Sequence, residues 1–262
     1  MTFKARLFWI LWASGFAGVL SFLLVDLSAL IASIPLPPGE PPVELPHPAL
    51  LKVVSTIQPT VILTLAVLAG VWLAGRVGLH APAAEAAARG DGFFPALKLQ
   101  IVPGVLAGLA SGVAIVLTWV IAKPFLSAEF VTRAEDFNKF VPHIVRFLYG
   151  GLTEELLLRW GVMTLLVWAA WRLLQKGEGP PTAAYFVGAI LTSAVLFGVG
   201  HLPIASMLSG GLTLPVVIYV ITGNSIFGIV AGFLYWKKGL EAAIIAHMSA
   251  HLVLITAIWL IL

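Results

Sequence analysis

The chain has 262 residues, of which 60% are apolar and 10% charged, and its mean hydropathy is +1.03. A soluble domain is typically about 45–50% apolar and about 25% charged, so these values exclude an ordinary soluble enzyme. The absence of cysteine excludes disulfides, thiolate metal sites and a cysteine nucleophile. The net charge of +3 forms no basic stripe, so we expect no nucleic-acid partner. The composition is that of a polytopic protein embedded in a lipid bilayer.

Runs of about 20 apolar residues, bounded by charges or prolines, predict seven membrane-spanning helices in an all-α bundle. They cover roughly residues 7–33, 49–74, 99–121, 142–174, 182–204, 212–236 and 239–262. The proline-rich stretch 34–42 predicts an exposed loop, and the alanine-rich stretch 83–89 predicts a short surface helix. The first apolar run is about 27 residues long, so we expect no cleavable signal peptide.

The polar residues divide the chain into two parts. Residues 1–140 hold N-terminal transmembrane helices and loops, and residues 141–262 hold a core in which ionisable side chains interrupt the apolar runs. We expect the fourth segment to cross the membrane once, although it is long. A re-entrant point at Gly150-Gly151 is the alternative, and it would reverse the orientation of everything that follows.

The distribution of Lys and Arg predicts the orientation, because cytoplasmic loops carry an excess of both. One set of segment ends carries nine basic residues: Lys4, Arg6, Arg76, Arg89, Lys98, Arg172, Lys176, Lys237 and Lys238. The other set carries four: Lys52, Lys123, Arg133 and Lys139. We therefore expect a cytoplasmic N-terminus.

Eight ionisable side chains remain at membrane depth once the loops and the ends of the predicted spans are set aside. They are Asp26, Arg146, Glu154, Glu155, Arg159, His201, His247 and His251. A charge at the centre of a bilayer costs roughly 3 kcal/mol on insertion scales. These groups are therefore expected to face one another or a hydrated cavity.

Helical spacing brings some of these groups together. Glu155 and Arg159 are four residues apart and can form an ion pair on one helix face, while Glu154 points about 100° away from Glu155. His247 and His251 are also four residues apart and share a face. With His201 on a third helix, the pattern predicts a convergent polar site among the last four spans, suited to activating water. A structural ion pair and packing histidines are the alternative interpretation.

Other charges need no catalytic explanation. Asp26 is expected at the membrane interface, and His143 and Arg146 are expected to extend from the start of the fourth span toward water. Glu241 follows Gly239 at the start of the last helix, where a carboxylate complements the helix dipole.

Three motifs resemble those of the CPBP family of intramembrane proteases, which includes type II CAAX prenyl endopeptidases and bacterial Abi and bacteriocin-processing proteins. Glu154-Glu155-Leu-Leu-Leu-Arg159 resembles the family motif EExxxR, and Phe197-Gly-Val-Gly-His201 resembles FxxxH. The run from Phe227 to Glu241 and the following His247 resemble the third motif, HxxxN or HxxxD. The resemblance covers about residues 145–255, and the motifs occur in the family's order.

The resemblance implies an intramembrane endopeptidase whose candidate site consists of Glu154, Glu155, Arg159, His201, His247 and His251. Glu154, with His201, is implied to activate the attacking water, and Glu155 and Arg159 to shape the site. His247 and the residue four positions on are implied to stabilise the oxyanion, a role in which preorganised donors contribute a few kcal/mol. The expected partner is a membrane-associated peptide or protein substrate.

The sequence departs from the family pattern at His251, where Asn or Asp is usual. A neutral histidine can donate a hydrogen bond as Asn does, so the oxyanion role is retained and no cofactor is expected. Glu154, His201, His247 and His251 are also suitable zinc ligands, so a zinc-dependent protease is an alternative. A non-catalytic immunity or scaffold protein of the same fold is a second alternative, and a proton-coupled carrier is a third.

The composition also bears on source and substrate. Enrichment in Ala, Gly, Pro and Trp with few Lys and Asn indicates a bacterial source of high genomic GC content, and hence an inner-membrane location. Bacteria generally lack prenylated CAAX proteins, so we expect a peptide-export or regulatory substrate rather than a prenylated C-terminus.

Overall fold

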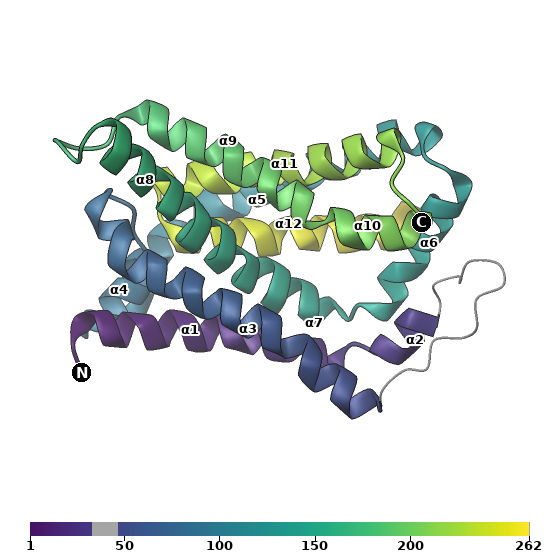
Figure 1. Cartoon of the computed structure of the whole chain (residues 1–262), viewed down its shortest axis with the longest axis horizontal. Coiled ribbons are helices and arrows are strands. Elements are labelled where there is room, and N and C mark those ends of the chain that lie inside the picture. The colour runs from purple at the N-terminus through teal and green to yellow at the C-terminus, as the bar shows by residue number, and fades with distance from the viewer. Residues whose placement is uncertain (33–46, 262) are drawn as a thin grey trace.

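The computed structural model describes residues 1–32 and 47–261, and in these residues it is built from helices and short connections (Figure 1). Seven helical segments of the described chain are long and apolar enough to cross a membrane. They cover Phe3–Leu24, Pro48–Arg76, Phe93–Phe125, His143–Leu174, Ala183–Ser209, Leu214–Lys237 and Leu240–Leu260. The protein is therefore an all-α integral membrane bundle, which confirms the predicted fold class. Helices suit this environment because lipid offers no hydrogen-bond partner to the backbone.

The first half of the chain supplies three spans and the helices that connect them. Its elements are α1 (Phe3–Ser21), η1 (Phe22–Leu24), α2 (Leu27–Ala32), α3 (Pro48–Leu73), η2 (Ala74–Arg76), α4 (Pro82–Arg89), α5 (Phe93–Ala122), η3 (Lys123–Phe125) and α6 (Ala128–Phe140). The predicted short helix at 83–89 is present as α4, but one face of it is buried against α1 and α5 rather than lying on the surface.

The predicted first segment, 7–33, is wrong at its C-terminal end. The backbone becomes extended at Val25, and the exposed Asp26 accepts a hydrogen bond from the Ala29 N–H at 3.0 Å, which starts α2 as a separate helix. A short side chain that bonds to a nearby backbone N–H favours a new helix start over continuation. The predicted loop at 34–42 lies outside the described residues.

The second half supplies the other four spans. Its elements are α7 (His143–Val145), the π-helices η4 (Arg146–Glu154) and η5 (Leu156–Met163), α8 (Thr164–Leu174), α9 (Ala183–Gly200), α10 (Leu202–Ser209), α11 (Leu214–Lys237) and α12 (Leu240–Ile261). The segment from α7 to α8 forms one span, so the predicted single crossing is correct and the re-entrant alternative is not observed. π-Helical turns are rare and frequently occur at functional sites.

The fifth span extends further than predicted. The sequence places its end at residue 204, but the helix continues through a bend at His201 into α10, which ends at Ser209. His201 is therefore inside the span rather than near its end.

Small residues bring the site-bearing helices close to their neighbours. A Cβ at Gly104, Gly108 or Gly112 of α5 would collide with atoms of α12, so this ridge allows the two backbones to approach closely. Thr153 of η4 donates a hydrogen bond to the Gly15 carbonyl of α1 at 2.7 Å. In Figure 1 the spans lie side by side, with α4 at one end of the bundle and α2 and α6 at the other.

Candidate functional site

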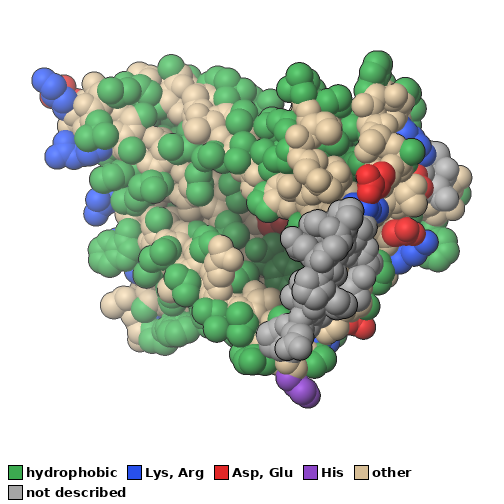
Figure 2. Space-filling model, turned by 45° about the vertical axis from the view of Figure 1, so that its right-hand side comes forward, with side chains coloured by type: hydrophobic (Ala, Val, Ile, Leu, Met, Phe, Trp, Pro, Cys, Tyr) green, Lys and Arg blue, Asp and Glu red, His purple; other side chains and the backbone are tan. Residues whose placement is uncertain are grey.

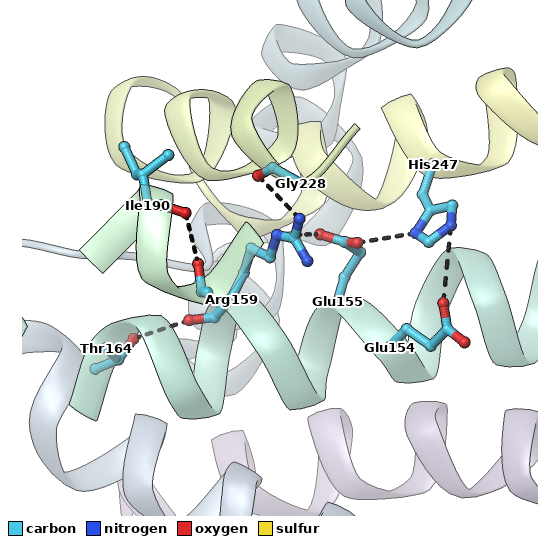
Figure 3. A network of polar contacts seen from close by, with 8 residues as sticks. Glu154, Glu155, Arg159, Thr164, Ile190, Gly228 and His247 are labelled. Atoms are coloured by element: carbon cyan, nitrogen blue, oxygen red, sulfur yellow. Dashed lines mark hydrogen bonds and ion pairs between the residues drawn. The ribbon is translucent and has the colours of Figure 1, made fainter. Parts of the chain in front are cut away.

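Glu155 and Arg159 form a fully buried ion pair on the π-helical span (Figure 3). Glu155 Oε2 lies 3.2 Å from Arg159 Nε, and both side chains are 0% exposed. The pair confirms the contact that the four-residue spacing predicts. Because a buried charge without a partner costs several kcal/mol, each member of this pair is needed to stabilise the other.

The Arg159 guanidinium has further partners on neighbouring helices. Its Nη2 donates to the Gly228 carbonyl of α11 at 3.0 Å. Its carbon Cζ lies 5.4 Å from the Phe197 ring centre and 5.7 Å from the Phe227 ring centre, within the range of cation–π attraction. Arg159 therefore ties the π-helical span to α9 and α11.

His247 of α12 lies between the two carboxylates (Figure 3). Its Nδ1 is 2.8 Å from Glu155 Oε1, and its Nε2 is 3.9 Å from Glu154 Oε2. A carboxylate at Nδ1 accepts the N–H from that nitrogen, which leaves the Nε2 lone pair directed toward Glu154 when the ring is neutral. His247 consequently donates from Nε2 only when both ring nitrogens carry protons.

Glu154 differs from its neighbour in its surroundings. Its side chain is 17% exposed, against 0% for Glu155. Among the described residues, no hydrogen bond to a Glu154 carboxylate oxygen is formed, and His247 is the one ion-pair neighbour. Of the two adjacent carboxylates, Glu154 is the one that lines a cavity and is available to a ligand or a water molecule.

The other two predicted histidines line the same cavity. His201 Nδ1 is 2.8 Å from the Phe197 carbonyl, so that nitrogen donates and Nε2 remains as an acceptor. The His251 ring stacks on His247 with centres 4.8 Å apart, and its buried Nδ1 has no hydrogen-bond partner in the described part of the chain. A Cβ on Gly150 would lie 2.5 Å from His251 Nε2, so only glycine leaves room for this ring.

The cavity has a volume of about 780 Å³ and is lined mainly by apolar side chains. It extends from the polar cluster along α5 and α12 to α6. Its polar lining includes Tyr149, Asn138 and Asn224, besides the residues already described. Figure 2 shows a hollow with hydrophobic walls in this face of the molecule. A mostly apolar cavity with a few convergent polar groups is the usual form of a ligand or active site.

All six predicted site residues are therefore part of one connected arrangement, with four of them lining the cavity and two forming the buried pair. Residues that the sequence analysis did not single out also contribute. Asn224 of α11 lines the cavity, and Phe227 packs against both Arg159 and His247. An amide within an apolar run was a usable signal for Asn224, whereas a phenylalanine in a membrane helix carries none.

Two charges that were assigned other roles behave differently from their predictions. Arg146 does not extend toward water: it is half-buried and lines the cavity. Glu241 does not serve only its own helix, because its Oε1 accepts the Ala84 N–H of α4 at 2.9 Å. Glu241 thus connects two elements distant in the sequence, which helical periodicity does not reveal.

The zinc alternative requires at least three ligands in one place. No group of three or more His, Asp or Glu side chains within residues 1–32 and 47–261 is arranged to hold a metal ion. His201 and His247 each have Nδ1 engaged by a carbonyl or a carboxylate, which leaves the Nε2 lone pair of each neutral ring available. The zinc-dependent protease therefore stays an alternative, and the cleavage assay proposed below tests it with a chelator.

The fold and site define an integral membrane protein with a polar, carboxylate-containing cavity inside its helical bundle. Residues 136–253 match the family model described as type II CAAX prenyl endopeptidase Rce1-like. The matched part of the chain carries every predicted site residue, and the match supports the resemblance to CAAX-type intramembrane proteases. Comparison with curated proteins and with solved structures finds no match.

Proposed function

We propose that the protein hydrolyses a peptide bond of a membrane-associated protein or peptide, with Glu154 as the general base. The observation that carries this proposal is the difference in surroundings between the two neighbouring carboxylates. Glu155 is held by Arg159 and His247, whereas Glu154 faces the cavity without a cationic partner at hydrogen-bond distance. A carboxylate in that position can accept a proton from a bound water molecule.

In the proposed reaction, a water oxygen attacks the scissile carbonyl carbon while Glu154, with His201 beside it in the cavity, takes the water proton. The tetrahedral oxyanion then collapses, the C–N bond breaks, and the proton is delivered to the leaving amine. One water molecule is consumed, and a new carboxylate and a new amine are released. Glu155 and Arg159 act as positioning residues, since both are buried away from the cavity.

His247 and His251 are the proposed oxyanion donors. A doubly protonated His247, whose Nδ1–H is accepted by Glu155, would donate from Nε2 on the Glu154 side. His251 stacks on His247 and lines the cavity at the same point. Preorganised donors of this kind act strongly where water is scarce, because the surroundings screen charge poorly.

The proposed location is the inner membrane of a bacterium, with the N-terminus in the cytoplasm. The excess of Lys and Arg at the α4 end of the bundle supports this orientation. The cavity lining runs from the polar cluster toward α6, at the opposite end. Substrate would then enter from the extracytoplasmic side or from the adjoining leaflet.

The test is cleavage of an internally quenched peptide library by the purified, reconstituted protein. The wild type is compared with Glu154→Ala and His201→Ala, each with and without a zinc chelator. The proposal expects cleavage by the wild type, loss in both variants, and no effect of the chelator. Cleavage that stops with chelator would support the zinc-dependent alternative. A folded wild type that cleaves no peptide but retains some of them would support the binding protein instead.

A further inference from the structure

Arg146 has surroundings that neither the ion-pair network nor the proposed hydrolysis explains. It begins the π-helical span and lines the same cavity as Glu154. Among the described residues it is the one Lys or Arg in that lining. A guanidinium in a mostly apolar cavity is costly unless an anion or several acceptors satisfy it.

The contacts of Arg146 hold it in place but satisfy it incompletely. Its Nη2 donates to Asn138 Oδ1 of α6 at 2.8 Å, and the Asn138 amide donates to the Ala134 carbonyl at 2.9 Å, which fixes the amide orientation. The buried Nε has no hydrogen-bond partner in residues 1–32 and 47–261. None of the ion pairs formed within those residues includes Arg146.

Neither of the two carboxylates that line the cavity forms an ion pair with Arg146. Glu135 pairs with Lys123 at 3.0 Å, and Glu154 lies beside His247. The planar guanidinium binds carboxylates through two parallel hydrogen bonds and is poorly replaced by other cations in that role. Within the described residues Arg146 Nη1 makes no hydrogen bond and is not among the buried, unpartnered atoms, so this oriented guanidinium in a ligand cavity matches a carboxylate brought by the ligand.

The position of Arg146 sets a distance from the proposed reaction centre. Arg146 and Glu154 are eight residues apart on one span, which is at most about 12 Å along the axis at the α-helical rise. An extended peptide covers about 3.3–3.6 Å per residue, so three or four residues bridge this distance.

We propose that Arg146, oriented by Asn138, is a specificity-determining residue that binds a carboxylate of the substrate a few residues from the scissile bond. This inference rests on the proposed hydrolysis at Glu154. The carboxylate has two possible sources, the C-terminus of the peptide or an Asp or Glu side chain. Either would be recognised by the same guanidinium.

The test uses two reconstituted-enzyme assays with internally quenched peptide libraries that are identical except for a C-terminal acid or amide. A third library carries the amide together with Asp or Glu near the end. The wild type is expected to cleave acid peptides with a kcat/KM about 10- to 100-fold above that of plain amides, the factor for one charge-assisted interaction. If kcat/KM for the third library rises to the value for acid peptides, an acidic side chain is identified as the source of the carboxylate.

The Arg146→Gln variant is expected to lose most of this acid-to-amide ratio, whereas Lys139→Gln, which removes an exposed cation on α6, retains it. The inference is overturned, without any variant, if the wild type cleaves the acid and amide libraries at equal rates and cleaves the third library no faster. If Arg146→Gln lowers the rates on acid and amide peptides equally, so that the acid-to-amide ratio of kcat/KM is unchanged, the role of Arg146 is purely structural. That result would also overturn the inference.

A binding experiment distinguishes failure of the proposed hydrolysis from failure of the Arg146 site. The same libraries are passed over immobilised Glu154→Gln protein, and retained peptides are identified by mass spectrometry. Retention of acidic over plain amide peptides, with no cleavage by wild type, would support the Arg146 site and contradict the hydrolytic function. Equal retention, or none, would overturn the Arg146 site.

Discussion

Glu154 and Glu155 are neighbours in the sequence but have different chemical surroundings. The side chain of Glu155 is enclosed by Arg159 and His247, and that of Glu154 reaches the cavity. Consecutive residues on a helix point in different directions, so a single turn of backbone places one carboxylate in the packed interior and one at a ligand site. This separation underlies the different roles that we propose for two identical side chains.

The space for His251 depends on Gly150, and this leads to a prediction. We expect Gly150→Ala to displace the His251 ring, because the added Cβ would lie 2.5 Å from its Nε2. If His251 stabilises the oxyanion, kcat should fall by about 10²–10³-fold, as for loss of one oxyanion donor. The measurement is steady-state cleavage beside His251→Ala. The double variant should be no worse than His251→Ala alone, and additive losses would contradict this explanation.

Which site residues could be predicted follows from their chemistry. Glu154, Glu155, Arg159 and the histidines are recognisable because ionisable groups are rare in membrane spans. The role of Arg146 was not predictable, since its partner Asn138 lies on a connecting helix whose position depends on tertiary packing. Phe197 and Phe227 around Arg159 were hidden among other apolar residues.

At the scale of elements, the contact between α5 and α12 supports one wall of the cavity. It relies on glycines spaced four residues apart along α5, which face the backbone of α12 and its side chains Ile245, Ser249 and Val253. Close backbone approach matters in lipid, where dispersion contacts rather than water exclusion hold helices together. α12 carries His247 and His251, so the spacing of the two helices sets the position of both histidines.

Replacement of one ridge glycine tests this contact. We expect Gly108→Ala to destabilise the protein by about 1–3 kcal/mol, the usual cost of overpacking, because its Cβ would meet the Ala246 carbonyl and lie 2.6 Å from Ser249 Cβ. The matched control is Gly188→Ala, where no atom lies within 4 Å of the added Cβ. Unfolding in mixed micelles followed by circular dichroism measures both. Equal stability of the two variants would contradict the proposed packing role.

The number of spans was predictable from apolar runs, but their ends were less so. Apolar residues continue on both sides of Asp26, where the backbone turns, and of His201, where the helix bends and continues. Hydropathy reports the surroundings of a segment rather than its backbone path. The π-helical winding around the site was likewise invisible, because it depends on packing against α1, α3 and α12.

At the scale of the whole molecule, the proposed orientation puts the basic α4 end in the cytoplasm and α6 outside. The chain contains no cysteine, so single cysteines can report this directly. We expect Thr132→Cys on α6 to react with a membrane-impermeant maleimide in intact cells, and Glu178→Cys to react only after permeabilisation. Both positions are exposed in the structure. The reverse labelling pattern would contradict the proposed orientation and the side from which substrate enters.

The most direct measurement of the central claim compares Glu154→Gln and Glu155→Gln in one reconstituted preparation, with kcat and unfolding stability recorded for each. We predict that Glu154→Gln lowers kcat by about 10²–10⁴-fold, as expected for loss of a general base, while stability stays at the wild-type value. Glu155→Gln should cost roughly 3–5 kcal/mol of stability, because it leaves the buried Arg159 charge without its partner. The exposed-pair control Asp136→Asn should change stability by less than about 1 kcal/mol. Wild-type hydrolysis by the Glu154→Gln protein would contradict the account.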